Sequence, residues 1–457
     1  MDRRRFLALS GAVLAAPLLV GEGVAAAPLT RRSVPGPRAA LVTRWDTDPW
    51  SRGSYSALPV GVSPSVRRTL ADVILGRRIA LAGEYASTEY PATTNGAYLS
   101  GRHAAGRLLE RVDPRTAVVI GAGMAGAAAA HRLREAGVRV TVLEARERIG
   151  GRIRSDQAWG VPVELGAAWI HGTRGNPLMP LARAADLTLV PTDYDDAVVR
   201  DTVTGRPSAQ ADRRWAALDR LIADLEDAWP PVDTSVAAWL RSRGWTDSRF
   251  DTWAAQVEIT QEYALDPDRL GVRATEEGGS FRGGDVLVGG GYESIPRELL
   301  AGIDVRLRTA VDAVSAQGAG VRAQLASGAD VSADVAVVAV PLSLLRAGKP
   351  LVDPMPASVN SAVRALATGV FEKVVLRYDE QWWGDHRVYG IVGGGVPGAP
   401  AGSLAALRWT EFYSLTDLLG FPALVGFSGG SAARSRPVRD PACVREATTA
   451  LRAAFAH

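Results

Sequence analysis

Three glycines and one acidic residue carry the clearest chemical signal in this chain of 457 residues. Gly121, Gly123 and Gly126 have the spacing G-x-G-x-x-G and follow the apolar run Thr116–Ile120, and Glu144 ends the next apolar run. The first glycine permits a tight turn, the second lets the backbone approach a diphosphate, and the third lets helix and strand pack closely. The helix N-terminus attracts the anion, and the acid binds a ribose. We expect a strand–turn–helix–strand unit that binds a dinucleotide.

The residues after Glu144 offer further groups for a phosphate. Gly150 and Gly151 precede Arg152, and a second glycine-containing run extends from Gly166 through Trp169 to His171. A pair of glycines allows the backbone to approach a ligand, and arginine presents a fork of donors to phosphate oxygens. Together these segments extend the expected nucleotide site beyond the first turn.

These segments resemble the FAD-dependent amine oxidases, which include monoamine oxidases, polyamine oxidases and flavin-type histone lysine demethylases. The resemblance implies that residues 150–152 line the FAD diphosphate, that residues 166–169 run along the flavin, and that Val311 contacts adenine. Glu84 matches an acid near the ribityl and diphosphate. Ser54 stands where monoamine oxidases attach FAD through cysteine, so FAD is expected to be noncovalent. The expected cofactor contacts are Gly121, Ala122, Gly123, Met124, Ala125, Gly126, Glu144, Ala145, Arg146, Gly150, Gly151, Arg152, Gly166, Ala167, Ala168, Trp169, Val311, Gly83, Glu84 and Thr94; no metal site is expected.

The same resemblance implies four residues at the reacting amine. Lys373 lies ten residues before Trp383, which is the spacing found in the family. The resemblance implies that this lysine reaches flavin N5 through a water. Burying a lysine on an apolar strand is costly, although a lysine at a sheet edge is the commoner case. Tyr55 matches one aromatic wall of the amine site, and Thr93 takes the place of the opposite wall, as in lysine demethylases and spermine-type oxidases. His171, in a Trp-Ile-His-Gly run typical of spermine and acetylpolyamine oxidases, is suited to tune amine protonation.

The order of these segments differs from that of the family. Residues 41–55 and 79–101 resemble the family's late W-x-x-D-P-x-x-x-G-S-Y stretch and final flavin-contact segment, yet here they precede the glycine turn. The simplest explanation is a circular permutation joined through Glu110–Pro114, which requires that Ala40 and Phe455 lie close together. A rearranged product that does not fold is the alternative.

The expected fold is α/β: a Rossmann-like FAD-binding domain with a mixed β-sheet and a second, α+β substrate-binding domain, in permuted order. A chain of this length fits two joined domains. The boundaries that we expect are 1–27 for a signal peptide, 28–39 for a leader, 40–112, 113–192 and 281–345 for the FAD-binding domain, 193–280 and 346–435 for the substrate domain, and 436–457 for a C-terminal helix.

The N-terminus and the composition bound location and partners. Arg3, Arg4 and Arg5 precede an apolar segment and small residues to Ala27, which resembles a twin-arginine export signal. Its apolar part is shorter than the ~20 residues that span a bilayer, so we expect cleavage after Ala26 and no stable membrane span; an uncleaved anchor is the alternative. A net charge of +3 gives no argument for nucleic acid. Cys443 is the only cysteine, which excludes an intrachain disulfide.

The expected function is oxidation of a C–N bond of a polyamine or related amine, with O2 reoxidising FAD to give H2O2 and the imine hydrolysing to an aldehyde. Distal ammonium groups require carboxylates, for which Asp193, Asp195, Asp196, Glu258 and Glu262 are candidates. An L-amino acid oxidase needs an arginine for the substrate carboxylate, and the family position for it holds Ala168-Trp169. That enzyme, and a permuted FAD-binding relic without turnover, are the alternatives.

Overall fold

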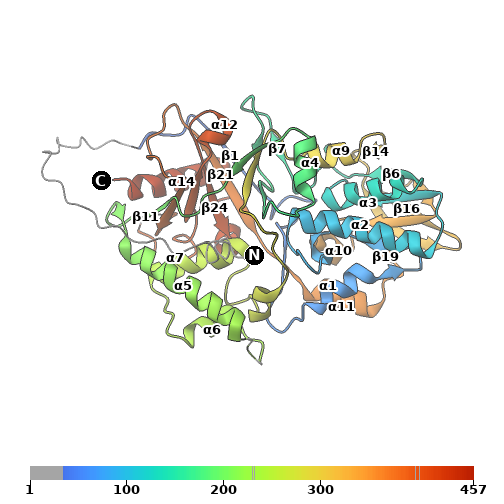
Figure 1. Cartoon of the computed structure of the whole chain (residues 1–457), viewed down its shortest axis with the longest axis horizontal. Coiled ribbons are helices and arrows are strands. Elements are labelled where there is room, and N and C mark those ends of the chain that lie inside the picture. The colour runs from blue at the N-terminus through green and yellow to red at the C-terminus, as the bar shows by residue number, and fades with distance from the viewer. Residues whose placement is uncertain (1–33, 229, 231, 397, 401, 457) are drawn as a thin grey trace, which may run out of the picture.

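The computed structural model describes residues 34–228, 230, 232–396, 398–400 and 402–456. The expected signal peptide, residues 1–27, lies outside this part of the chain. The described residues form two lobes, one around helix α14 (Asp440–Ala454) and one around helices α2 (Thr94–Arg111) and α3 (Met124–Glu135) (Figure 1). No helix within the described ranges is long and apolar enough to cross a membrane.

The lobe around α2 and α3 is built on a six-stranded sheet. Its strands, in spatial order, are β14 (Asp304–Arg306), β6 (Arg139–Leu143), β5 (Thr116–Ile120), β18 (Val335–Val338), β4 (Ile79–Leu81) and β3 (Ile74–Leu75). The central strand β5 is apolar throughout because both of its faces are covered. Ala117 and Val119 pack with α2 and α3, whereas Val118 and Ile120 pack toward a four-stranded sheet. That sheet contains β17 (Asp330–Ala333), β16 (Gly320–Leu325), β15 (Val311–Gln317) and β19 (Leu351–Asp353).

The lobe around α14 contains a seven-stranded sheet. Its strands, in spatial order, are β1 (Ala39–Val42), β21 (Phe371–Arg377), β24 (Ala423–Gly429), β23 (Glu411–Ser414), β22 (Val388–Val392), β11 (Ala197–Asp201) and β12 (Arg206–Pro207). The expected FAD-binding segment 40–112 therefore begins in the other lobe. Strand β1 pairs antiparallel with β21, Leu41 opposite Val375, because its apolar side chains complete this sheet; the FAD-binding lobe takes up the chain only later.

The remaining elements connect and cover these sheets. A small sheet consists of β10 (Thr188–Pro191), β13 (Val286–Gly289) and β9 (Trp169–Ile170). Strand β9 carries Trp169 and leads into His171, two residues of the site described below. Besides α2, α3 and α14, the described α-helices of five or more residues are α1 (Ser65–Asp72), α4 (Leu178–Ala184), α5 (Ala209–Ala228), α6 (Val236–Arg241), α7 (Arg249–Ala255), α9 (Ser294–Leu299), α10 (Leu342–Arg346), α11 (Ala357–Ala365) and α13 (Gly430–Arg434). A π-helical segment (Gln256–Thr260) joins α7 to the short helix α8 (Gln261–Tyr263).

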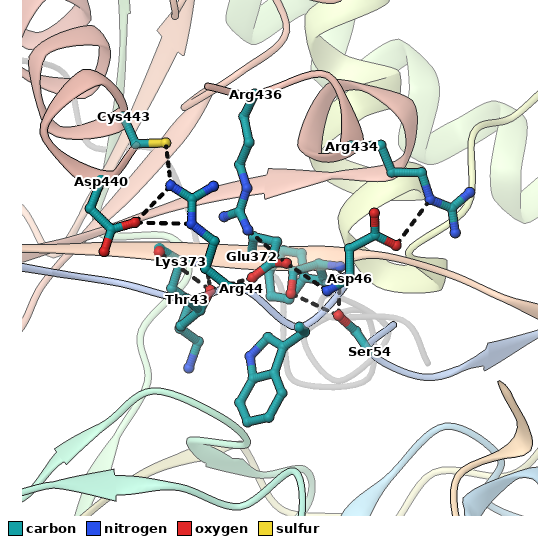
Figure 2. Close-up of polar contacts among 12 residues, drawn as sticks. Thr43, Arg44, Asp46, Ser54, Glu372, Lys373, Arg434, Arg436, Asp440 and Cys443 are labelled. Carbon is teal, nitrogen blue, oxygen red and sulfur yellow. Dashed lines mark hydrogen bonds and ion pairs between the residues drawn. The ribbon is translucent and has the colours of Figure 1, made fainter. Parts of the chain in front are cut away.

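Three segments that are far apart in the sequence, residues 43–46, 371–373 and 436–440, are joined by ion pairs and hydrogen bonds beside β1 (Figure 2). Glu372 is fully buried and forms an ion pair of 2.9 Å with Arg436. Its carboxylate also accepts hydrogen bonds from Thr43 Oγ1 at 2.5 Å and from the backbone N–H of Asp46 at 3.0 Å. Nearby, Arg44 pairs with Asp440 at 2.6 Å. A buried charge pair whose carboxylate accepts further hydrogen bonds fixes geometry, so these contacts hold the segment 43–46 in one position against strand β21.

The expected proximity of Ala40 and Phe455 is present. Both side chains pack against the same buried cluster, which includes Trp383 and Leu451. Arg452 Nε donates a hydrogen bond of 3.1 Å to the carbonyl oxygen of Val34. Cys443 is buried in that cluster on α14 and is a free cysteine. The C-terminal helix and the first described strand are thus neighbours, which is the geometry that a permuted order requires.

Candidate active site

One cavity of about 600 Å³ is lined by residues from both lobes, a size within the ~300–1,000 Å³ range of ligand and cofactor sites. It brings together the four residues expected at the amine, Lys373, Tyr55, Thr93 and His171. It is also lined by every expected cofactor residue except Ala122 and Gly126. Those two are buried in the turn and support it from behind.

The glycine turn has the geometry that a diphosphate needs. Gly121 has φ +101°, and a Cβ on Gly126 would lie 1.9 Å from the carbonyl oxygen of Gly121, so both positions exclude a side chain. Gly123 has no atom other than backbone of the Gly150-Gly151 pair near its Cβ position, which leaves its cavity side open. Glu144 accepts hydrogen bonds from the N–H groups of Ala122 at 2.7 Å and Arg146 at 2.9 Å, so the acid is fixed at the edge of the nucleotide pocket.

Two arginines and one aspartate hold the walls of this pocket. Arg148, which sequence reasoning passed over, donates hydrogen bonds to the carbonyl oxygens of Ile149, Gly151 and Ile153. Its burial lowers the pKa of the guanidinium to about 10. Arg146 does not lie free for a phosphate: it forms a bidentate pair with Asp48, with both distances at 2.7 Å. Asp48 thereby ties the loop after β1 across the nucleotide end of the cavity.

A chain of buried charges lines the middle of the cavity. Glu84 forms an ion pair of 2.8 Å with Arg152 and accepts a hydrogen bond of 2.6 Å from Ser56 Oγ. Burial opposes ionisation of Glu84, but Arg152 and Ser56 outweigh it and hold its pKa below the usual range. Arg67, which no motif marked, continues the chain: it donates to Ser56 Oγ at 2.7 Å and pairs with Glu277 at 2.6 Å. Both members of that pair are almost fully buried.

Lys373 lies on the face of β21 that points into the cavity, away from its neighbour Glu372 (Figure 2). Its side chain is buried, and Nζ donates hydrogen bonds to the carbonyl oxygens of Gly166 at 2.6 Å and Glu164 at 3.2 Å. An ammonium group has three donors, so one remains for a group in the cavity. Burial lowers the pKa of Lys373 to about 8, while Glu164 opposes the shift.

Trp383 lies on the opposite side of the sheet. It packs in the buried cluster with Tyr378 and Trp382 under α14, so the tryptophan that helped to mark Lys373 in the sequence is itself a core residue. A different sequence signal marks Lys373 without any family pattern: the chain contains two lysines, Lys349 and Lys373, beside many arginines. Because this chain uses arginine for almost all of its positive charges, a lysine at a buried strand position indicates a site that requires an ammonium group rather than a guanidinium group.

Aromatic rings form the wall around Lys373. Trp169 lies with its ring centroid 5.6 Å from Lys373 Nζ, and Tyr55 lies 6.3 Å from Phe371 at an interplanar angle of 57°. Tyr55 is fixed by a hydrogen bond of 2.5 Å to the carbonyl oxygen of Gln261. Phe371 lines the cavity two residues before Lys373 and was not anticipated. An aromatic pair beside the lysine provides an apolar wall where the sequence suggested a single ring.

Thr93 lines the cavity but its hydroxyl serves the backbone. Its Oγ1 donates to the carbonyl oxygen of Tyr90 at 2.8 Å and accepts from the N–H of Gly96 at 2.9 Å, which caps helix α2. Capping by threonine satisfies one of the unpaired N–H groups at a helix start. Thr93 therefore orients α2 toward the cavity, together with its neighbour Thr94.

His171 is held by a carboxylate that the sequence did not single out. Its Nδ1 lies 2.7 Å from Oδ2 of Asp285, which also accepts hydrogen bonds from Tyr194 Oη and the N–H of Gly172, both at 2.9 Å. Burial opposes ionisation of Asp285, but His171 and these donors outweigh it and lower the pKa of Asp285 to about 2. Only the paired geometry of two distant loops reveals this contact.

The carboxylates expected to hold distal ammonium groups are only partly in place. Glu262 of α8 lines the cavity, and Glu277 joins it. Asp193, Asp195, Asp196 and Glu258 are absent from the described lining. Asp193 accepts backbone N–H groups of its own turn, Asp196 pairs with His386, and Glu258 accepts from Trp215 Nε1. Three of the four expected carboxylates, Asp193, Asp196 and Glu258, are therefore engaged in local contacts.

The residues present fit a dinucleotide: a glycine cradle closed to side chains, an acid fixed beside it, and a continuous cavity from this turn to a buried lysine. The architecture and the site thus define a two-lobed, dinucleotide-binding oxidoreductase. The sequence profile of the flavin containing amine oxidoreductase family matches residues 24–109, 124–270 and 273–456, and the chain belongs to this family. Its cofactor is FAD.

Known relatives agree with this assignment. Polyamine oxidase 3 of Oryza sativa subsp. japonica is 29% identical over 343 residues, covering 70% of this chain and 68% of the relative. Polyamine oxidase 4 of the same plant is matched over 62% of its length. Lysine-specific histone demethylase 2 of Homo sapiens is 27% identical over 75% of this chain and 44% of its own. The structure of wild-type putrescine oxidase bound to putrescine has a TM-score of 0.56 at 20% identity, covering 74% of this chain and 82% of that one; it shows the fold.

Proposed function

We propose that this amine oxidase acts on a polyamine or a related amine that carries a second cationic group, with noncovalent FAD and with O2 as acceptor. The observation that supports it most is the single cavity joining the glycine turn, the Lys373 ammonium and the aromatic wall. Glu262 supplies negative charge to the same cavity, which suits a substrate with more than one amine. Three of the four arginines that line the cavity, Arg67, Arg146 and Arg152, are engaged by Glu277, Asp48 and Glu84, which disfavours an amino acid oxidase.

The roles of the chain's residues follow from their positions. FAD, when bound, supplies the acceptor for the hydride from the carbon next to the amine nitrogen and passes the electrons to oxygen. Tyr55, Phe371 and Trp169 exclude bulk water and hold the amine against an apolar wall. The third donor of Lys373 orients a water in the cavity. His171 hydrogen-bonds the amine, which must be neutral so that its lone pair assists loss of the hydride. The imine product then hydrolyses to an aldehyde and a shorter amine.

Noncovalent FAD is supported by the position of Ser54. Its hydroxyl donates to the carbonyl oxygen of Phe371 and accepts from the N–H of the same residue, both at 2.8 Å. The hydroxyl is therefore engaged with strand β21, and serine does not form a thioether. Acid precipitation is expected to release all of the FAD into the supernatant; yellow colour that stays with the pellet would contradict this.

The decisive experiment is anaerobic titration. Purified yellow protein is mixed with spermine, spermidine, putrescine, a monoamine and an L-amino acid, and the flavin absorbance is followed. We expect bleaching by a polyamine and recovery in air with release of H2O2. Bleaching by the monoamine alone or by the amino acid alone would contradict the polyamine proposal and assign the enzyme to that substrate class. Yellow protein that no amine bleaches would indicate a binding protein without turnover.

Two further features stay proposals. We propose export through the twin-arginine signal; a reporter fused to residues 1–27 is expected outside the cytoplasm, and replacing Arg3, Arg4 and Arg5 by lysine is expected to retain it inside. We also propose that the segment order is a circular permutation. The proximity of Ala40 and Phe455 supports it.

A further inference from the structure

The imidazole of His171 and the carboxylate of Asp285 come from separate loops that meet at the cavity. His171 follows strand β9 and Asp285 precedes strand β13, and the two strands pair antiparallel, with Ile170 opposite Val286. The register places the residues just beyond each strand end side by side. Backbone hydrogen bonds of 2.6 Å from Thr173 to Gly283 and from Arg174 to Arg282 continue the pairing. The contact is therefore built into the sheet rather than formed by two mobile side chains.

Every oxygen of Asp285 is used in a way that fixes it as an acceptor. Oδ1 accepts from the N–H of Gly172, and Oδ2 accepts from Tyr194 Oη and faces His171 Nδ1. The side chain is 16% exposed, and the imidazole is 34% exposed toward the cavity. The donors Gly172 N–H and Tyr194 Oη favour the ionised carboxylate. An ionised carboxylate has no proton to donate, so the imidazole nitrogen that faces it, Nδ1, carries the proton of this contact.

We infer that Asp285 is a positioning residue for amine oxidation: it holds the proton of His171 on Nδ1, so that Nε2 is the ring nitrogen presented to the substrate amine. This inference rests on the proposed function. An imidazole with Nδ1–H fixed by a carboxylate accepts a hydrogen bond at Nε2 and is stabilised when Nε2 takes up a proton. The substrate ammonium thereby has a defined acceptor for the proton that it must lose. Tyr194 holds the carboxylate in line with the ring.

The other charged groups of the described residues that line this cavity are Arg52, Arg67, Glu84, Glu144, Arg146, Arg152, Glu262, Glu277, Asp312, Lys349 and Lys373. Arg67, Arg146 and Arg152 are paired with Glu277, Asp48 and Glu84, whereas Lys373 disfavours additional positive charge on His171 and Glu262 favours it. Their influence on His171 is common to wild type and to an Asp285 variant, so a difference between those two proteins reports the carboxylate alone.

The first test is spectroscopic and needs no turnover. Holoenzyme with ¹⁵N-labelled histidine has five imidazoles, and the His171 signal is the one lost in His171→Gln. We expect wild type to show Nδ1 protonated and Nε2 unprotonated at high pH, and Asp285→Asn to show a mixture of tautomers because an amide both donates and accepts. A wild-type signal with the proton on Nε2, or no change in the variant, would overturn the inference.

The second test is the pH profile of anaerobic flavin reduction by the amine that the titration identifies. Asp285→Asn is expected to lower the limiting rate by about 10-fold or more and to move the acid limb of the profile to lower pH, because the carboxylate no longer favours the protonated ring. Asp285→Glu is expected to restore the limb in part, and Tyr194→Phe to keep its position. An unchanged limb in Asp285→Asn would contradict the inference. If no amine reduces even wild type, the proposed function fails, and the tautomer still decides the role of Asp285.

Discussion

The Nζ atom of Lys373 lies 2.6 Å from the carbonyl oxygen of Gly166, so a strand of the seven-stranded sheet is joined at the cavity to the loop that follows the dinucleotide turn. The ammonium group is buried and faces backbone carbonyl oxygens rather than a carboxylate. Such a charge is expensive to keep. Its presence therefore has consequences both for the reaction and for the stability of the fold.

Replacing Lys373 by methionine is expected to slow flavin reduction by about 100-fold or more, with FAD still bound. Methionine has a similar length but no donor for a water in the cavity. Stopped-flow absorbance measures the rate, and the flavin spectrum of the purified variant measures retention. Lys349→Met, the same change at the other lysine, which is exposed and also lines the cavity, is the comparison and is expected to lower the rate much less. Equal rates in the two variants would remove Lys373 from the mechanism.

The same lysine predicts how stability depends on pH. Burial lowers the pKa of Lys373 in the folded protein to about 8, below the usual lysine value of 10.5. Between these values the unfolded chain binds more protons, so the free energy of unfolding rises with pH. The shift corresponds to about 3 kcal/mol over the whole window. We expect Lys373→Met to be more stable than wild type below pH 8 and the gap to shrink toward pH 10. Urea unfolding of both proteins at pH 7, 8, 9 and 10 measures it; a gap that widens with pH would be evidence against the shift.

Glu84 is expected to govern retention of the cofactor. Glu84→Gln leaves Arg152 without its ion-pair partner in a buried site, which typically costs ~3–5 kcal/mol. The variant is expected to lose FAD during gel filtration and to unfold at lower urea. Asp379→Asn removes an exposed pair with Arg38 and is expected to change stability by less than ~1 kcal/mol. Because the pKa of Glu84 is depressed, its contribution is present above the unfolded value and is lost as the pH falls below it.

Two glycines of α2 provide a matched comparison. A Cβ on Gly101 would lie 2.0 Å from the carbonyl oxygen of Ala125 in α3, whereas a Cβ on Gly106 would meet nothing within 4 Å. Gly101→Ala is expected to separate the helices and to destabilise by ~1–3 kcal/mol, with weaker FAD binding because α2 and α3 begin at the cavity. Gly106→Ala is expected to stabilise by ~0.5–1 kcal/mol. Thermal unfolding and FAD titration compare the two, and equal effects would contradict the close packing of α2 on α3.

The segment order has its own test. A chain that runs from residue 113 to 456 and continues, through a short linker, with residues 34–112 restores the order of the family. Because Arg452 contacts Val34, the linker spans neighbouring backbone and we expect a folded, yellow protein. Circular dichroism and anaerobic reduction compare it with the natural order. A colourless or unfolded product would indicate that the connection through residues 112–115 is itself required.

The sequence alone determined the parts of this protein whose chemistry is local. Gly121, Gly126 and Glu144 act through a turn and two strands that lie within a few dozen residues, so their spacing predicted the nucleotide turn and, with the neighbouring motifs, the cofactor. Lys373, Tyr55 and His171 were placed through family resemblance, and the structure brings them to one cavity. The offset to Trp383 served only to recognise Lys373; Trp383 itself packs in a core cluster on the other side of the sheet.

Only the tertiary structure decided which groups engage these residues. Asp285 meets His171, Asp48 meets Arg146, and Glu277 meets Arg67 across separations of about a hundred residues or more. No local pattern encodes such pairs, because each partner is one charged residue among many exposed ones until folding buries it. The same holds for β1, which pairs with β21 while Thr43 and Asp46 after it donate hydrogen bonds to Glu372, more than 300 residues later in the sequence.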